Sequence, residues 1–228
     1  KVIGLVGDSI TAHGNYVFFL NQYYASKYPE SNIVILNKGI SGDSAKGILG
    51  RLDWDLFNEN DALGYGACDE ITVMIGMNDV GYNDFNKGPQ EDYAAAFPNK
   101  PKTINTIVGR IETIVQECQE RNVPITLITP SLYDESDRFT NTLTGGTKHG
   151  TNWALGEVAK GVLALGEKYD VPVLDLYKAS NEYSDRIRAN NPSAKTVITG
   201  TDGLHHSANG GYMIGYIIAN EQEKDDTV

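Results

Sequence analysis

The sequence contains little of several features, and each shortage narrows what the protein can be. Its two cysteines, Cys68 and Cys118, are too few for a disulfide framework or a cysteine-based metal site. No apolar run approaches the length of a membrane span, so membrane insertion is not expected. The 19 basic residues are outnumbered by 30 acidic ones, and the formal net charge of −11 disfavours nucleic acid or an anionic membrane surface as a partner.

Sequence patterns for several kinds of site are also missing. The chain has no Gly-x-x-x-x-Gly-Lys loop for binding phosphate and no Gly-x-Ser-x-Gly elbow of the α/β-hydrolase type. No group of His, Cys and Asp has the spacing of a structural zinc site, and we expect neither a metal nor an organic cofactor. There is no leader peptide, but a leader or tag can be removed, so the compartment stays open between the cytoplasm and secretion.

What the sequence does contain is a regular alternation of strands and helices. Its 228 residues, 40% of them hydrophobic, suit one domain spanning residues 1–228. Five short apolar runs predict strands covered on both faces, namely Val2–Val6, Ile33–Leu36, Ile71–Ile75, Ile125–Ile128 and Val171–Leu174. The clearest helices are expected at Asn15–Lys27, Thr103–Arg121, Trp153–Tyr169 and Ser207–Asn220, with Ser207 as an N-cap. We therefore predict an α/β fold, a three-layer α/β/α sandwich around a five-stranded parallel sheet.

This arrangement places both cysteines near the amino-terminal edge of the sheet. Cys118 lies on the apolar face of its predicted helix, which favours a buried thiol. A bridge between Cys68 and Cys118 is also geometrically feasible in such a fold, and that alternative stays open at this point.

Ligands of open α/β sheets bind beyond the carboxyl ends of the strands, so the residues after each strand are the ones to examine. The first strand is followed by Gly7-Asp8-Ser9-Ile10-Thr11 and then a helix. A serine on such a sharp turn can present its hydroxyl above the sheet edge, close to a helix N-terminus that favours anions. The same residues also suit an ordinary turn and helix cap.

A possible base lies near the end of the chain. In Asp202-Gly203-Leu204-His205-His206, an aspartate and a histidine three residues apart can face the same way. The carboxylate can then hold Nδ1–H of the imidazole and leave Nε2 to accept a proton. A surface turn with a capping aspartate fits the same pattern. His13 and His149 have no comparable partner in the sequence and are expected to be solvated, or at most substrate contacts.

Hydrogen-bond donors follow the second and third predicted strands. Asn37-Lys38-Gly39-Ile40-Ser41-Gly42 has two glycines that permit close approach of a backbone N–H to a ligand. Gly76-Met77-Asn78-Asp79 has an asparagine whose amide can point into the crevice. Taken alone, each fits a flexible connection or an Asx turn. Together with the serine and the Asp-x-x-His pair, they supply a complete hydrolytic site at one sheet edge.

These four segments resemble, in order, the conserved blocks of the SGNH hydrolases, also called GDSL-type esterases and lipases. The resemblance covers nearly the whole chain, and it implies a flavodoxin-like fold with five parallel strands. It also implies a Ser-His-Asp triad of Ser9, His205 and Asp202. The implied oxyanion hole consists of Ser9, Gly42 and Asn78. His206 stands where relatives often carry proline, but the Asp-x-x-His spacing favours His205 as the base.

The resemblance implies a serine esterase acting on a small-molecule or oligosaccharide ester. Two long connections, Asp79 to Lys102 and Pro130 to Asn152, are expected to build the pocket walls, and their aromatic rings among polar residues suit a sugar. We therefore predict removal of short acyl groups, above all acetyl, from a carbohydrate. Candidate substrate contacts are Asp8, which should also brace the turn before Ser9, and Tyr82, Tyr133, Trp153 and His206. The alternatives are a lysophospholipase or thioesterase for longer acyl chains, and a non-catalytic carbohydrate-binding module on the same scaffold. The acyl acceptor and the oligomeric state are left open by the sequence.

Overall fold

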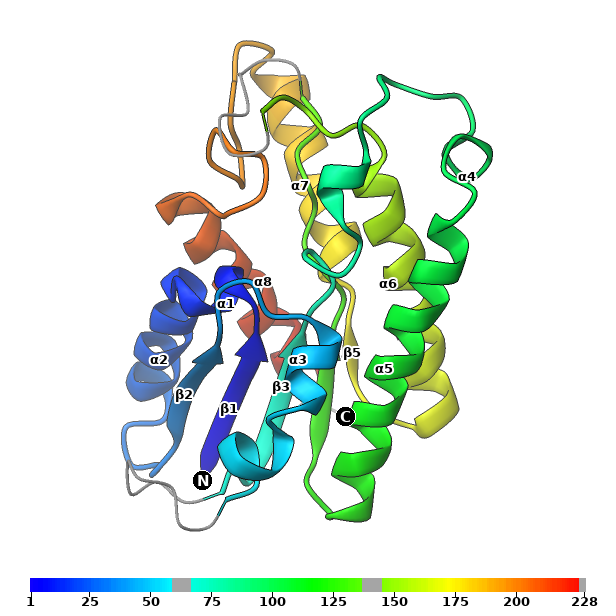
Figure 1. Ribbon diagram of the computed structural model, residues 1–228. Helices are drawn as coiled ribbons and strands as arrows, with labels where there is room; N and C mark the ends of the chain where they lie inside the picture. The colour runs from blue at the N-terminus through cyan, green and yellow to red at the C-terminus, as the bar shows by residue number, and fades with distance from the viewer. Residues whose placement is uncertain (59–66, 137–144, 226–228) are drawn as a thin grey trace.

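Five parallel strands form a single sheet in the order β2-β1-β3-β4-β5 (Figure 1). The computed structural model describes residues 1–58, 67–136 and 145–225. The strands are β1 (Val2–Gly7), β2 (Val34–Gly39), β3 (Glu70–Met74), β4 (Ile125–Ile128) and β5 (Val173–Leu174). The predicted α/β architecture with a five-stranded parallel sheet is therefore confirmed.

Helices cover both faces of the sheet, as the right-handed crossovers between parallel strands require. The helices are α1 (Ser9–Ala12), α2 (Asn15–Lys27), α3 (Ala45–Leu49), α4 (Tyr93–Ala96), α5 (Lys100–Glu120), α6 (Thr151–Tyr169), α7 (Leu176–Asn190) and α8 (Ala208–Asp225), with short helical turns η1 (Leu52–Leu56) and η2 (Tyr82–Asp84). On one face α5 packs between α3 and α6, and on the other α8 packs against α2 and α7 (Figure 1).

The predicted elements differ from the observed ones mainly at their ends. Strand β5 is shorter than expected because Pro172, which has no N–H, precedes it and only its carbonyl joins the sheet, accepting from Leu127. The cap predicted at Ser207 is confirmed, since its hydroxyl accepts a hydrogen bond from the N–H of Gly210 at 3.0 Å.

The sequence pattern missed α7 altogether. Its buried residues are Leu176, Ser180 and Ser184, which lie four residues apart on one face. Two of the three are small and polar, so the fully buried face of this helix lacks the run of large apolar residues that marks α5.

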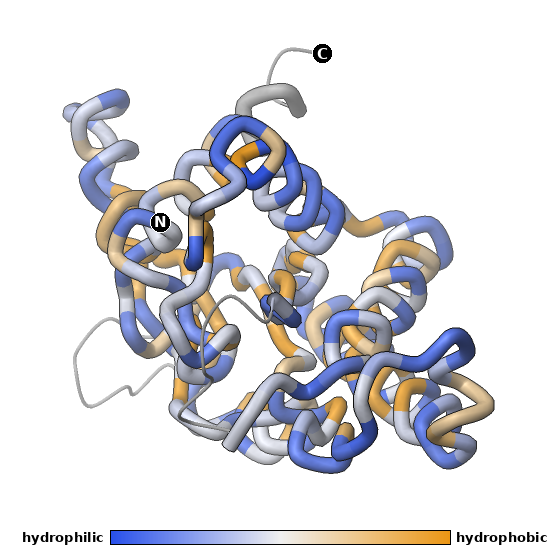
Figure 2. Tube along the Cα trace, turned by 90° about the horizontal axis from the view of Figure 1, so that it is seen from above, coloured by the Kyte–Doolittle hydropathy of each residue, from blue (hydrophilic) through white to orange (hydrophobic). Residues whose placement is uncertain are grey.

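Viewed onto the carboxyl ends of the strands, the hydrophobic segments lie inside and the hydrophilic ones on the outer helix turns (Figure 2). The core fills both faces of the sheet, but the packing under α2, α7 and α8 leaves a cavity of about 780 Å³. Leu5, Ile35 and Thr72 line it from the sheet and Ile218 from α8. Ser9 does not line this cavity, so the cavity lies apart from the predicted chemistry.

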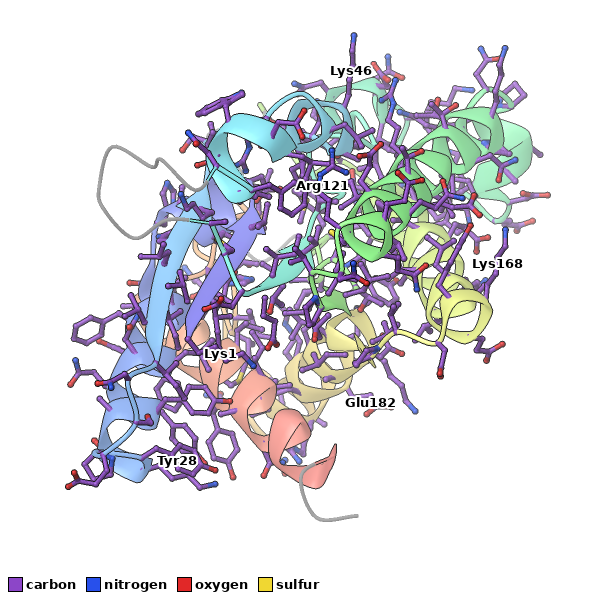
Figure 3. The ribbon with its side chains drawn as sticks, turned by 90° about the horizontal axis from the view of Figure 1, so that it is seen from below. Lys1, Tyr28, Lys46, Arg121, Lys168 and Glu182 are labelled. Atoms are coloured by element: carbon purple, nitrogen blue, oxygen red, sulfur yellow. The ribbon has the colours of Figure 1, made fainter. Side chains whose placement is uncertain are left out.

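Both cysteine side chains are buried thiols, and they form no disulfide with each other. Cys68 lies just before β3, where its Sγ fills the space beside Gly4, and Cys118 packs on the buried face of α5. The bridge left open by the sequence is thus not formed. Seen from below, Arg121 at the end of α5 lies beside η1, where its guanidinium donates to Asp53 at 2.9 Å (Figure 3).

Within the described residues, no helix combines the length and the apolar character needed to cross a membrane. The same part of the chain contains no group of three or more His, Cys, Asp or Glu side chains arranged to hold a metal ion.

Candidate active site

Ser9 begins the one-turn helix α1, directly beyond the end of β1. Asp8 caps this helix by accepting a hydrogen bond from the N–H of Ile10 at 2.9 Å. The turn packs tightly at Gly7, where there is no room for a side chain. A Cβ at that position would lie 2.2 Å from the hydroxyl of Thr11, so the close approach requires glycine. The close packing of α1 onto β1 therefore presents Ser9 at the carboxyl edge of the sheet.

Ser9, His205 and Asp202 form a continuous chain of hydrogen bonds. The Oγ of Ser9 lies 2.8 Å from Nε2 of His205, and Nδ1 of the same ring lies 2.7 Å from Oδ2 of Asp202. These three residues are separated by up to 196 positions, and the fold brings them together. This is the geometry in which a carboxylate orients an imidazole and the imidazole withdraws a hydroxyl proton.

Asp202 is held as a carboxylate by its hydrogen bonds. Partial burial opposes ionisation, but hydrogen bonds from the His205 ring and from the N–H groups of Leu204 and His205 outweigh it, so the pKa of Asp202 lies below its usual value. The acid that faces the imidazole is therefore negatively charged at neutral pH.

The turn that carries Asp202 and His205 is fastened to the end of β4. The N–H of Asp134 donates to the carbonyl of Gly203 at 2.8 Å, and the buried carboxylate of Asp134 pairs with Arg188 on α7. Nε2 of His206 lies 3.1 Å from the hydroxyl of Ser131. These contacts fix the base relative to the sheet, and the sequence pattern did not reveal them.

The predicted oxyanion donors lie on two neighbouring connections. Gly42 has a positive φ of 81°, which favours glycine, and a Cβ there would meet no atom within 4 Å. The amide of Asn78 donates to the carbonyl of Asp43 at 2.9 Å, and Asp79 accepts from the N–H of Ala45. The segments containing Gly42 and Asn78 are thereby joined, at the strand ends on either side of β1.

Two of the five predicted substrate contacts are enclosed, and the other three are partly exposed. Asp8 and Tyr133 are 2% and 1% exposed, so both are enclosed in the protein rather than on a pocket wall. His206 is held through Nε2, and its Nδ1 is buried; burial, followed by the nearby charge of His205, lowers the pKa of His206 to about 4. The neutral ring therefore supports the turn through Nε2, and because the residue is partly exposed its contact with substrate stays a prediction.

The remaining aromatic candidates hold loops in place. Trp153 is half-buried and stacks on Tyr93 with ring centroids 5.9 Å apart, and Tyr82 packs partly against the core. Phe85 is fully buried against Phe97. These rings pin the connection after β3 to the body of the protein. Phe139, an aromatic residue of the connection from Pro130 to Asn152, lies outside the described residues.

His13, which was expected to be solvated or at most a substrate contact, is exposed and lies against His205. Its exposed imidazole lies beside the ring of His205, with centroids 4.7 Å apart and planes tilted by 36°. Its position four residues after Ser9 was the available signal, because residues four apart share a helix face.

Comparisons with known proteins were made with this geometry in hand. A model of the GDSL-like lipase/acylhydrolase family matches residues 5–211. A gut microbial diltiazem-metabolizing enzyme, BT4096, has a similar structure, with a TM-score of 0.83 and 21% identity over 98% of this chain. The match covers 47% of that enzyme, so this chain spans about half of its length.

Two acetylxylan esterases are also similar in structure. Axe2 from Geobacillus stearothermophilus has a TM-score of 0.69 and 20% identity, and the match covers 97% of this chain and 93% of Axe2. The acetyl xylan esterase AlAXEase has a TM-score of 0.69 and 17% identity, covering 97% of this chain and 99% of that one. No curated protein matches the sequence. At these identities the likeness concerns the fold.

Proposed function

The chain belongs to the GDSL-like lipase/acylhydrolase family and has the SGNH hydrolase fold, and we propose that it is a serine esterase that removes short acyl groups, above all acetyl, from a carbohydrate. The observation that carries the proposal is the chain of hydrogen bonds from Ser9 through His205 to Asp202. A hydroxyl, an imidazole and a carboxylate in this order are the elements of nucleophilic acyl transfer.

In the proposed mechanism His205 accepts the proton of Ser9 as Oγ attacks the ester carbonyl. The resulting imidazolium is stabilised by the carboxylate of Asp202. His205 then returns the proton to the alcohol oxygen as its bond to the acyl carbon breaks, and the acyl group stays on Ser9. Water, deprotonated by the same imidazole, hydrolyses this acyl-enzyme and restores the serine.

The negative oxygen of each tetrahedral intermediate would be held by the N–H groups of Ser9 and Gly42 and by the amide of Asn78. The amide carries two N–H groups, and its hydrogen bond to the carbonyl of Asp43 orients the second. Donors fixed in this way before the reaction stabilise charge as it develops.

The choice of an acetylated carbohydrate is supported by the relatives and by the form of the site. Two of the structurally similar proteins are acetylxylan esterases by name. In Axe2, substitutions of a serine, of an aspartate and of the histidine three residues after it are described as catalytic mutants, the same spacing as Asp202 and His205. The two long connections after β3 and β4 carry aromatic rings among polar residues, a composition that suits a sugar better than a long acyl chain.

The first test is the substitution Ser9→Ala. We expect it to abolish hydrolysis of 4-nitrophenyl acetate while the far-UV circular dichroism stays that of the wild type. The matched control is Ser31→Ala, which removes an exposed hydroxyl before β2, at the opposite edge of the sheet, and should leave the activity unchanged. Full activity of Ser9→Ala would refute the catalytic assignment. Failure of a fluorophosphonate to label Ser9 in the wild type would instead favour a carbohydrate-binding module.

The acyl group is tested by comparing acetyl, butyryl and decanoyl esters of the same alcohol. The proposal requires kcat/KM to be highest for the acetyl ester and to fall with chain length. A rise with chain length would favour the alternative function, a lysophospholipase or thioesterase.

A further inference from the structure

His13 is placed by the same helical turn that presents the nucleophile. The N–H of His13 donates to the carbonyl of Ser9 at 2.9 Å, so the two residues begin and end one turn of α1. Gly14, with a φ of 79°, then turns the chain into α2 and leaves His13 at an exposed corner. Ser9 and His13 therefore both face His205, one through a hydrogen bond and the other through its ring.

The imidazole of His13 has polar atoms that the described part of the chain does not use. Among the described residues, no hydrogen bond is made by either ring nitrogen of His13, and the side chain is exposed. A neutral imidazole has one N–H donor and one nitrogen acceptor, so it can either donate a hydrogen bond to a hydroxyl group or accept one from it. Packing on His205 holds this polar ring at the reacting centre.

The chemistry determines which part of a substrate comes close to His13. When the ester bond breaks, the alcohol oxygen must lie within about 2.6–3.2 Å of Nε2 of His205 to receive the proton. The ring of His13 has its centroid only 4.7 Å from the centroid of that imidazole. Groups on the carbons next to the alcohol oxygen are therefore within contact of His13, whereas the acyl group lies on the side of the oxyanion donors.

We propose that His13 determines specificity on the alcohol side of the site, by binding a hydroxyl group on the carbon next to the ester oxygen. This inference rests on the proposed esterase function and extends it. A vicinal hydroxyl is the feature that distinguishes an ester of a sugar or polyol from an ester of a simple alcohol. One hydrogen bond of this kind contributes a preference of about twofold to tenfold.

The test compares two acetates that differ in that hydroxyl alone, trans-2-hydroxycyclohexyl acetate and cyclohexyl acetate, by the rate of acetate release. Both esters yield the same acetyl-enzyme, so the ratio of their kcat/KM values reports only on the alcohol side. We expect the wild type to prefer the hydroxylated ester and His13→Ala to lower the ratio about fivefold.

Two further variants separate recognition from packing. His13→Phe keeps an aromatic ring against His205 but has no hydrogen-bonding atom, and it should lower the ratio as His13→Ala does. His13→Gln keeps a donor and an acceptor and should recover part of the preference. An unchanged ratio in the Ala and Phe variants would overturn the inference. It would also be overturned if His13→Ala lowered kcat/KM equally on both esters and His13→Phe restored the activity. Inactivity of the wild type on both esters would count against the proposed function itself.

Discussion

Among single residues, Asp8 has a charge in an environment that disfavours it. Its carboxyl is 2% exposed, and burial raises its pKa to about 6, against hydrogen bonding from Ile10 and attraction to His205. Asp79 is partly buried, and burial raises its pKa to about 6 as well. Near the proposed base, the protein therefore retains carboxyl groups whose ionisation lowers the stability of the fold.

We expect Asp8→Asn to stabilise the protein at neutral pH but not in acid. The pKa of Asp8 in the folded protein, about 6, exceeds its ordinary value of 3.8, so protonation of Asp8 favours folding. This contribution to stability is fully present below pH 3.8 and is lost as the pH rises through 6. Asparagine stays neutral and still caps α1. The free energy of unfolding of Asp8→Asn relative to wild type should thus rise between these pH values, by on the order of 2–3 kcal/mol.

Urea unfolding at pH 4 and pH 8 measures this change. Asp92→Asn, at the exposed N-cap of α4, is the matched control because it makes the same chemical change without removing a buried charge. A stability difference for Asp8→Asn that is the same at both pH values would contradict the prediction.

At the scale of elements, the connection from β2 to α3 depends on one buried cation. Arg51 is 4% exposed and donates through Nε to Asp43 at 2.9 Å and through Nη2 to the carbonyl of Lys38 at 2.8 Å. It also pairs with Asp55 on η1. The loop that contains Gly42 is thereby tied to β2 behind it and to η1 beside it.

We predict that Arg51→Met destabilises the fold by about 3–5 kcal/mol, because it removes the cation that pairs with the enclosed carboxylate of Asp43 and leaves Asp55 paired with Lys38 alone. The urea midpoint measures the loss. Lys160→Met is the control, because it breaks an ion pair with Glu157 in which the lysine side chain is 74% exposed, and such pairs contribute at most about 1 kcal/mol. Equal effects of the two substitutions would show that the Arg51 network does not support the loop.

In the molecule as a whole, the reactivity of the two buried cysteine thiols measures how readily the core unfolds. Cys68 and Cys118 are 3% and 0% exposed, and burial raises the pKa of the Cys118 thiol to about 12. A thiol that is enclosed and protonated reacts only when the surrounding structure opens.

Thiol titration with a chromogenic disulfide should therefore find no fast-reacting group in the native protein. In denaturant without reductant it should find two. Fewer than two in denaturant would mean that the cysteines are oxidised, and fast reaction of the native protein would mean that the core around α5 or β3 opens readily.

The parts that the sequence predicted are those whose signal is local. Apolar runs marked the strands, and Ser207 marked the start of α8, because strand burial and helix capping depend on neighbouring residues. The helix α7 was missed because Ser180 and Ser184 form its buried face. The burial of Tyr133 was not foreseen for a related reason, since an aromatic residue in a polar loop can be buried by contacts that the loop sequence does not contain.

The sequence by itself determined the family, the parallel sheet and the candidates Ser9, Asp202, His205, Gly42 and Asn78, because strand ends collect at one edge and the family's motifs follow those ends. Only the tertiary structure decided which side chains meet there. It placed His13 on the ring of His205. It also turned the adjacent His205 and His206 to different partners, Ser9 for the first and Ser131 for the second. Burial and contact across the sheet edge depend on residues far apart in the chain, and no local pattern contains them.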